Sequence, residues 1–305
     1  MISLTGFACL VQPLPRIEEV PVLLATCADL PAGDEDAPLL LAALEEAGVA
    51  ARWAVWDDPE VDWTAGLTVL RSTWDYTHHR SKFLDWVRGL PRVANDAPLV
   101  EWSTDKAYLV DLAAAGVPTV PTEVAAPGQP LPEFTTEVIV KPSVGAGSRG
   151  VGRFTPDRIG EAREHAERLH AAGRTVLVQP YLHGVDDTGE AALLYFDGAF
   201  SHAITKGAMI PAATAHPVEG GSLFIEENIT PRTASAAEQA VGDAAVAYVR
   251  DRFGGDPLYA RVDLLPGPDG PVVVELELVE PSLFLQHDGD GRAAARFAAA
   301  VRKRA

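Results

Sequence analysis

Three carboxylates near the carboxyl end of the chain are spaced for a shared site. Arg261-Val-Asp263 and Glu275-Leu-Glu277 lie in two apolar segments joined by the turn-forming residues 266–270. Because strand side chains alternate between faces, a hairpin here brings the three carboxylates together on one face, with apolar neighbours on the other. Oxygen ligands suit Mg²⁺, which also binds substrate phosphates. The pattern predicts a metal site at Asp263, Glu275 and Glu277; the alternative is an exposed acidic face balanced by Arg261.

A glycine-rich loop follows a short apolar segment that ends at Lys141. It matches G-x-G-x-x-G, but it leads into a strand-like segment and lacks a following Lys-Ser/Thr pair, so it fits neither a Rossmann nor a Walker loop. Between two antiparallel strands such a loop can fold over a triphosphate, with Lys141 adding positive charge. The alternative is a flexible hairpin with a surface lysine. The loop residues expected at the phosphates are Gly145, Gly147, Ser148 and Gly150.

Two more segments are compatible with a bound nucleotide. Lys106 lies near the start of a predicted helix at 104–115, where its charge opposes the helix dipole unless an anion faces it. Residues 176–182 form an apolar strand that enters a polar linker, which ends at Glu190. Such a segment can place backbone groups along an adenine edge and a carboxylate near ribose hydroxyls. A solvated lysine and an ordinary strand end are the alternatives.

The first third of the chain must position any substrate, and it alternates strands with helices. We expect strands at 20–25, 52–56 and 67–71, one helix after the acids at 34–36, and another at 81–90. This order is typical of a parallel sheet covered by helices. Open sheets of this kind bind ligands beyond the carboxyl ends of their strands, where residues 71–76 fall.

Residues 71–76 are therefore assigned to an amino-acid substrate. The segment consists of Arg71, Ser72, Thr73, Trp74, Asp75 and Tyr76. Arg71 would bind a carboxylate, Asp75 an ammonium group, and the two aromatic residues would form walls. The alternative is a tryptophan packed in the core beside a helix cap at Ser72 or Thr73. The acids at 34–36 follow a strand end and would border the same pocket.

The rest of the chain mixes helices with antiparallel hairpins. Strands are expected at 137–140 and 176–178, with a helix at 157–172 between them. The dipeptide Asp197-Gly198 predicts a hairpin of 191–196 with 201–205. A long helix at 234–252 precedes the acidic hairpin, 258–265 with 272–278, and a helix at 291–304 follows it.

Composition limits the class of partner. The 305 residues are 47% hydrophobic and include 43 acids against 25 bases, a net charge of −18. Such a chain repels a phosphate backbone, which excludes nucleic acid as the main partner, whereas a small anion bound by clustered bases is not excluded. No apolar run reaches the ~20 residues of a spanning helix, so no membrane partner is expected. Two cysteines suit a reducing cytoplasm, and residues 2–14 lack the basic start of a signal peptide.

Taken in chain order, these features resemble the ATP-grasp superfamily over residues 95–305. The resemblance implies a chain of α/β and α+β class, with an ATP-grasp fold behind an N-terminal Rossmann-like βαβ domain. It also implies three domains: a substrate-side domain at 1–97, a central subdomain with the glycine-rich lid at 98–180, and a C-terminal subdomain with the metal site at 181–305.

The resemblance implies an ATP site as well. Lys106 and Lys141 match the two phosphate-contacting lysines of the superfamily, and residues 145–150 match its mobile lid. The adenine hinge and the ribose ligand are matched by Gln179, Tyr181, Leu182 and Glu190.

The acidic hairpin matches the magnesium site of the superfamily. Asp263 and Glu275 match metal ligands, whereas Glu277 stands where many members have asparagine, so the number of ions, one or two, is left open. Mn²⁺ is the alternative metal. Catalytic roles are implied for the basic residues Arg261, Arg149 and Lys206, with Arg261 on the acyl-phosphate oxygens and Arg149 in the lid.

A narrower resemblance lies in three strings, Arg71-Ser-Thr-Trp-Asp-Tyr76, Glu101-Trp-Ser-Thr-Asp-Lys106 and the segment 275–284. They resemble the ATP-grasp group of cycloserine synthetases, which cyclise O-ureido-D-serine. The implied activity is an ADP-forming carbon–nitrogen ligation through an acyl phosphate on a small amino-acid-like substrate. The alternatives are an intermolecular amino-acid, dipeptide or glutathione-synthetase-like ligase, a small-molecule kinase, and a nucleotide-binding regulator without chemistry. Whether the chain forms a homo-oligomer is left open.

Overall fold

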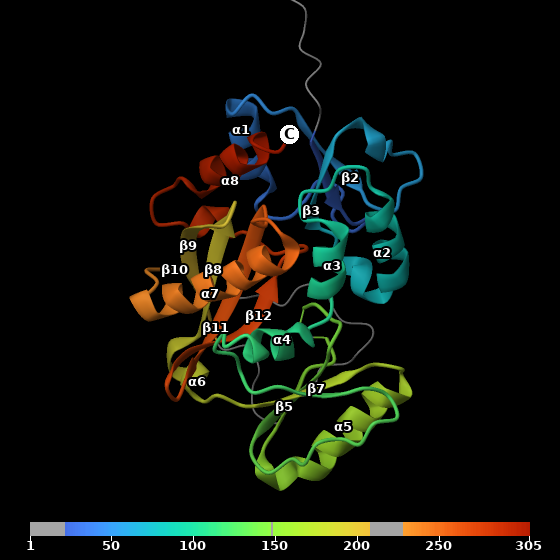
Figure 1. Ribbon diagram of the computed structural model, residues 1–305, viewed down its shortest axis with the longest axis vertical. Helices are drawn as coiled ribbons and strands as arrows, with labels where there is room; N and C mark the ends of the chain where they lie inside the picture. The colour runs from blue at the N-terminus through green and yellow to red at the C-terminus, as the bar shows by residue number, and fades with distance from the viewer. Residues whose placement is uncertain (1–21, 148, 208–227) are drawn as a thin grey trace, which may run out of the picture.

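The computed structural model describes residues 22–147, 149–207 and 228–305, so the predictions for Ser148 and for residues 1–21 lie outside the described residues (Figure 1). The chain folds into one parallel and two antiparallel sheets, which confirms the mixed class predicted from the sequence. In the described part of the chain, no helix is both long and apolar enough to cross a membrane.

The N-terminal part is a three-stranded parallel sheet in the order β2-β1-β3, as the βαβ pattern predicts. Its strands are β1 (Val22–Thr26), β2 (Ala51–Val55) and β3 (Leu67–Ser72), and its helices are α1 (Ala37–Glu46), η1 (Trp63–Ala65), η2 (Trp74–His78) and α2 (Arg80–Gly89). Every residue of β1 and β3 is buried, as expected of apolar strands in a covered parallel sheet.

The helix predicted at 104–115 is present only over residues 108–114. The chain forms two shorter helices instead, α3 (Ala97–Ser103) and α4 (Tyr108–Ala114), and Lys106 lies between them. The cause is a strong earlier start: the Asp96 side chain accepts a hydrogen bond from the Leu99 N–H at 3.1 Å, and a proline occupies the first turn of α3. The basic side chain at 106 is therefore carried by an inter-helix turn.

The middle of the chain forms a four-stranded antiparallel sheet in the order β4-β7-β5-β6. The elements are β4 (Glu123–Ala125), β5 (Val138–Pro142), β6 (Gly152–Phe154), η3 (Pro156–Arg158), α5 (Ile159–Ala171) and β7 (Val176–Pro180). Helix α5 packs on the sheet through Ala162, Ala166 and Leu169, and the glycine loop connects β5 to β6. The loop therefore joins two antiparallel strands, as predicted.

The C-terminal part is a five-stranded antiparallel sheet in the order β10-β9-β8-β11-β12. Its elements are α6 (Gly184–Thr188), β8 (Glu190–Phe196), β9 (Ala199–Lys206), β10 (Ile229–Arg232), α7 (Ala236–Phe253), β11 (Tyr259–Gly267), β12 (Gly270–Glu277), η4 (Leu285–His287) and α8 (Ala293–Arg302). Both predicted hairpins are confirmed, β8 with β9 and β11 with β12.

Two hydrophobic cores lie on opposite faces of this sheet. Leu193 and Tyr195 of β8 pack in the core that includes α7, whereas Leu194 and Phe196 pack in the core that includes α1 and α8. Helices α1 and α8 come from opposite ends of the described chain and lie side by side in Figure 1. The N-terminal part is thereby joined to the C-terminal sheet, which brings residues 30–36 and 279–286 to one cavity.

Candidate active site

A cavity of about 980 Å³ opens where the three parts of the chain meet. The predicted site residues that line it are Trp74, Tyr76, Lys106, Lys141, Gly145, Gly147, Arg149, Gln179, Tyr181, Leu182, Glu190, Lys206, Arg261, Glu275 and Glu277. Asp263 does not line the cavity itself, but it contacts Arg261 and Lys206, which do. Residues that the chain separates by two hundred positions therefore share one space.

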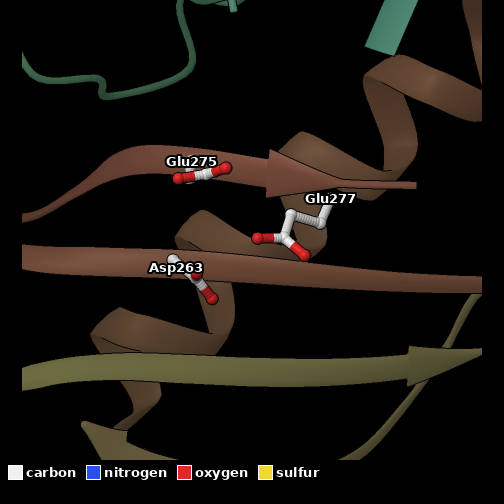
Figure 2. A group of neighbouring side chains, drawn as sticks. All are labelled: Asp263, Glu275 and Glu277. Carbon is white, nitrogen blue, oxygen red and sulfur yellow. The ribbon is translucent and has the colours of Figure 1, made fainter. Parts of the chain in front are cut away.

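The acidic hairpin supplies a compact group of carboxylates. Asp263 on β11 pairs in register with Glu275 on β12, and oxygens of Asp263, Glu275 and Glu277 lie within 4.8 Å of one another. Figure 2 shows them on two neighbouring strands. The opposite face is apolar, because Val262 and Leu276 are buried in the core under α7. This is the arrangement that the period-2 pattern predicts.

Basic side chains balance each carboxylate of this group. Arg261 Nε lies 2.9 Å from Asp263 Oδ1, and its Nη2 lies 2.5 Å from Glu277 Oε1. Lys206 Nζ lies 2.7 Å from Asp263 Oδ2, and Lys106 Nζ lies 3.1 Å from Glu275 Oε1. Three carboxylates this close repel one another, so the cations are what allow them to be buried together.

Charge and burial pull the carboxyl pKa values apart. Burial raises the pKa of Asp263, but the Arg261 and Lys206 charges more than offset it and hold that pKa well below its usual range. Burial and neighbouring carboxylates raise the pKa of Glu277 to about 7 despite Arg261. Three close, mostly ionised oxygen donors fit a hard divalent cation, whose charge would join those of the lysines and the arginine.

Lys141 is the buried cation of this site that makes no ion pair or hydrogen bond with any described residue. It lies on β5, is 8% exposed and lines the cavity. Burial lowers its pKa to about 8. A lysine that is desolvated without a protein partner is stabilised by an anion in the cavity, and a phosphate is such an anion.

The glycine loop lies against the N-terminal part. Gly147 and Gly150 have φ of 59° and 72°, the left-handed region that favours glycine. Arg149 Nη2 lies 2.6 Å from Thr77 Oγ1 and 3.4 Å from the Trp74 carbonyl oxygen, while Lys106 Nζ donates to the Gly145 carbonyl at 2.5 Å. The loop is therefore held at both ends, over the cavity that it lines.

The residues of the predicted adenine hinge also line the cavity. The Gln179 amide donates to Thr122 Oγ1 at 2.9 Å, and the Arg153 guanidinium lies 3.4 Å from the centre of the Tyr181 ring. Glu190 begins β8 and forms an ion pair with Lys206, which also contacts Asp263. Glu190 thus lies between the hinge and the carboxylate group, and its assignment to a ribose stays a prediction.

The structure does not favour direct substrate contacts by Arg71 or Asp75. Arg71 is fully buried, and its guanidinium contacts Asp34 at 3.3 Å and the Pro281 carbonyl oxygen at 3.0 Å. Asp75 accepts a hydrogen bond from the Trp56 indole at 2.9 Å. Neither residue lines the cavity, because partners distant in sequence turn both side chains inward.

Ser72 and Thr73 are likewise buried away from the cavity, and Ser72 hydrogen-bonds Thr26 at 2.8 Å. The cavity is also lined by Glu280, which the sequence made only a weaker candidate beside the acidic hairpin because it breaks the strand alternation, and by three residues that the sequence did not single out: Ser282, Phe284 and Gln286. Ser282 and Phe284 had no sequence signal beyond the family resemblance of the segment 275–284, and Gln286 lies outside that segment. The acidic residues 34–36 do border the cavity, as expected.

The fold and the cavity together define the class, an ATP-grasp ligase. A crystal structure of D-alanine–D-alanine ligase from Bacillus anthracis complexed with ATP resembles this chain with a TM-score of 0.62, over 93% of this chain and 97% of that one. At 14% identity this likeness concerns the fold alone.

Within that class the chain belongs to the D-cycloserine synthetase family. It is 41% identical over 290 residues to the cycloserine biosynthesis protein DcsG of Streptomyces lavendulae, covering 89% of this chain and 94% of that one. The crystal structure of D-cycloserine synthetase DcsG resembles it with a TM-score of 0.82 at 38% identity, over 93% of this chain and 99% of that one. The family model for the N-terminal domain of D-cycloserine synthetase DcsG matches residues 22–95.

Proposed function

We propose that this ATP-grasp ligase cyclises O-ureido-D-serine to D-cycloserine. The observation that carries the proposal is the convergence of the carboxylate group, Arg261 and Lys141 in one cavity, in a chain whose similarity to DcsG extends over almost its full length. The cavity is lined by Lys106 and Lys141, which offer positive charge to a triphosphate, and also by apolar side chains such as Val279 and Phe284, which suit the walls of a small-substrate pocket. An intermolecular ligation of amino acids would use the same site.

The reaction needs no nucleophile from the protein. A substrate carboxylate oxygen attacks the γ-phosphorus of ATP, giving an acyl phosphate and ADP. The oxyamine nitrogen of the same molecule then attacks the acyl carbon, loses its proton, and phosphate leaves. Ring closure leaves the carbamoyl group on that nitrogen, and one water is consumed when the group departs as carbon dioxide and ammonia. The protein contributes position and charge.

Each basic residue has a proposed place in this sequence. Lys106 and Lys141 neutralise the phosphates of ATP, and Arg149 holds the glycine loop over them. Arg261 lies beside the carboxylate group and stabilises the negative oxygens of the acyl phosphate. Lys206 links Glu190 to Asp263 and thereby fixes the group that faces the phosphates.

We propose that Asp263, Glu275 and Glu277 hold Mg²⁺, with Mn²⁺ as the alternative. When bound, the ion supplies positive charge to the phosphate oxygens of the nucleotide. The three residues offer only oxygen ligands, and the nucleotide would add phosphate oxygens. Both features favour Mg²⁺ over metals that prefer nitrogen or sulfur ligands. We also propose a cytoplasmic location and a small-molecule substrate, as the composition suggests.

The test is product analysis with purified protein, ATP and Mg²⁺. With O-ureido-D-serine we expect equimolar ADP and D-cycloserine by mass spectrometry. ADP release only with a second amino acid present would replace cyclisation by intermolecular ligation. A stable phosphorylated product would identify a kinase, and ATP binding without ADP release from any amino acid would identify a regulator. The matched control is Asp263→Asn, which we expect to fold and to release no ADP.

A further inference from the structure

One buried acid that lines the cavity differs from the others. Among the residues that the structure describes, four acidic side chains are buried: Asp36, Glu238, Asp263 and Glu280. The first three have an arginine or lysine nitrogen within 4 Å, whereas Glu280 has none. A buried carboxylate without a cation is costly, so this position is expected to serve a positively charged ligand.

The backbone at this position is held rigidly by the N-terminal part. The Trp74 indole donates to the Glu280 carbonyl oxygen at 2.8 Å, and Arg71 Nη1 donates to the next carbonyl oxygen, of Pro281, at 3.0 Å. Trp74 also lines the cavity. Residues 71–76 therefore act on the cavity through the segment that carries Glu280, which explains why Arg71 is buried.

The surroundings of the Glu280 carboxyl favour an ammonium group over a metal ion. The carboxyl is hydrogen-bonded by the buried Tyr76 hydroxyl, and it is not one of the three carboxylates whose oxygens lie within 4.8 Å of one another. Burial and the Glu277 charge raise its pKa to about 8, and the charge of Lys106, which is not in ion-pair contact, offsets this only in part. One carboxylate and one hydroxyl are too few oxygen ligands for a magnesium ion, but they can accept hydrogen bonds from an ammonium group.

We propose that Glu280 binds the α-ammonium group of the amino-acid substrate, whose carboxylate is activated next to Arg261. This rests on the proposed function, because it requires a substrate that carries both groups. It replaces Asp75, the acid assigned to the ammonium group from the sequence, which the Trp56 indole holds away from the cavity. Tyr76 and Trp74 then form the walls around that group.

The test compares two substrates in two proteins. The substrates are O-ureido-D-serine and its analogue with hydrogen in place of the amino group, and the proteins are the wild type and Glu280→Gln. We expect the substitution to lower kcat/KM for the amino substrate by about 100-fold, to leave kcat/KM for the analogue within about threefold, and to leave the KM for ATP unchanged. Thermal unfolding checks the fold, and we expect the melting temperature not to fall near pH 7, because burial keeps most of this carboxyl protonated and glutamine is a neutral replacement of the same size.

A control and two contrary outcomes complete the test. Glu45 is exposed on α1 and does not line the cavity, so Glu45→Gln is expected to leave kcat/KM for both substrates unchanged. Equal losses for both substrates in Glu280→Gln, or no loss for either, would overturn the proposal. If the wild type releases no ADP with O-ureido-D-serine, the proposed function fails instead. The same comparison is then made with the amino acid that supports ADP release and its desamino counterpart.

Discussion

Lys141 is the residue at which stability and function are most clearly opposed. Its folded-state pKa of about 8 lies below the usual 10.5, so the folded protein binds fewer protons than the unfolded chain between these values. The loss of folding stability caused by burying the charged lysine is fully present below pH 8, and it disappears as the pH rises toward 10.5. We predict that Lys141→Met stabilises the protein by about 1–3 kcal/mol at pH 7 and by much less near pH 10.

Chemical denaturation of both proteins across pH 6.5–10 measures this difference. The control is Lys82→Met, a substitution of an exposed lysine on α2. It is expected to show no such gain in stability because the Lys82 side chain is 62% exposed. If the Lys141→Met protein is less stable than the wild type at pH 7, other interactions in the nucleotide-free protein must outweigh the cost of burying the Lys141 charge.

The same pKa predicts how ATP affinity depends on pH. ATP binds the charged form of Lys141, which loses its proton in the free protein as the pH rises through about 8. We predict that the Kd for ATP rises above pH 8 by up to about tenfold per pH unit, and that this dependence is absent in Lys141→Met, which binds ATP weakly at every pH. Isothermal titration calorimetry at fixed Mg²⁺ measures the Kd for ATP at each pH. A wild-type Kd that does not change with pH would show that the lowered pKa of Lys141 does not affect ATP binding.

At the residue scale, the sequence predicted local sites better than distant ones. Asp263, Glu275 and Glu277 could be predicted because their shared face follows from alternation within one hairpin. Arg71 could not, because its ion pair with Asp34 joins residues 37 positions apart, and nothing in its own segment shows that pairing. The family resemblance drew attention to residues 71–76, but only the fold shows that Arg71 and Trp74 donate hydrogen bonds to the backbone carbonyl oxygens of Pro281 and Glu280.

At the scale of elements, two helical glycines make a matched pair with opposite expected effects. A Cβ on Gly242 of α7 would lie 2.3 Å from the Tyr195 hydroxyl oxygen, whereas one on Gly160 of α5 would meet nothing within 4 Å. We predict that Gly242→Ala destabilises by about 1–3 kcal/mol through overpacking and that Gly160→Ala stabilises by up to about 1 kcal/mol.

Thermal and urea unfolding of the two variants tests this pair. Gly160 is exposed near the start of its helix, so its gain comes from helix propensity alone. If both changes stabilise the protein, α7 shifts away from β8 at little cost. In that case the close packing of α7 on the sheet does not require a glycine at position 242.

Elements were predicted from the sequence where periodicity and turn residues agreed. The β8–β9 and β11–β12 hairpins followed from their turns, and the parallel sheet followed from alternating strands and helices. Helix α3 was not predicted, and α4 begins at Tyr108 and not at residue 104 as expected. The short elements α6 and β10 were missed because each is five residues or fewer and forms only in contact with the rest of the fold.

At the scale of the molecule, Asp36 ties the N-terminal part to the C-terminal end. Its carboxylate accepts hydrogen bonds from the backbone N–H groups of Leu283, Phe284 and Leu285 at 2.7, 3.1 and 2.7 Å. We predict that Asp36→Asn, which places an amide donor against these donors, destabilises by about 2–4 kcal/mol. Because the adjacent segment lines the cavity, the KM for the amino-acid substrate is expected to rise while the KM for ATP stays within about twofold.

Unfolding and steady-state kinetics on the same preparation measure both effects. Glu45→Gln, an exposed acid on the same helix, is the control and is expected to change neither quantity. A parallel rise of both KM values in Asp36→Asn would indicate general loosening of the molecule and would contradict a specific effect on the substrate end of the cavity.

The cations that balance the carboxylate group have a consequence for how the protein exists between turnovers. Asp263, Glu275 and Glu277 are compensated by Arg261, Lys206 and Lys106, which are covalently part of the chain. We therefore expect the chain to fold without an imported ion, unlike a domain that is unstructured without its metal. Under the proposed function, magnesium can arrive and depart with each nucleotide. The abundance of the protein is then insensitive to magnesium supply, and only its rate of turnover follows the concentration of the ion in the cell.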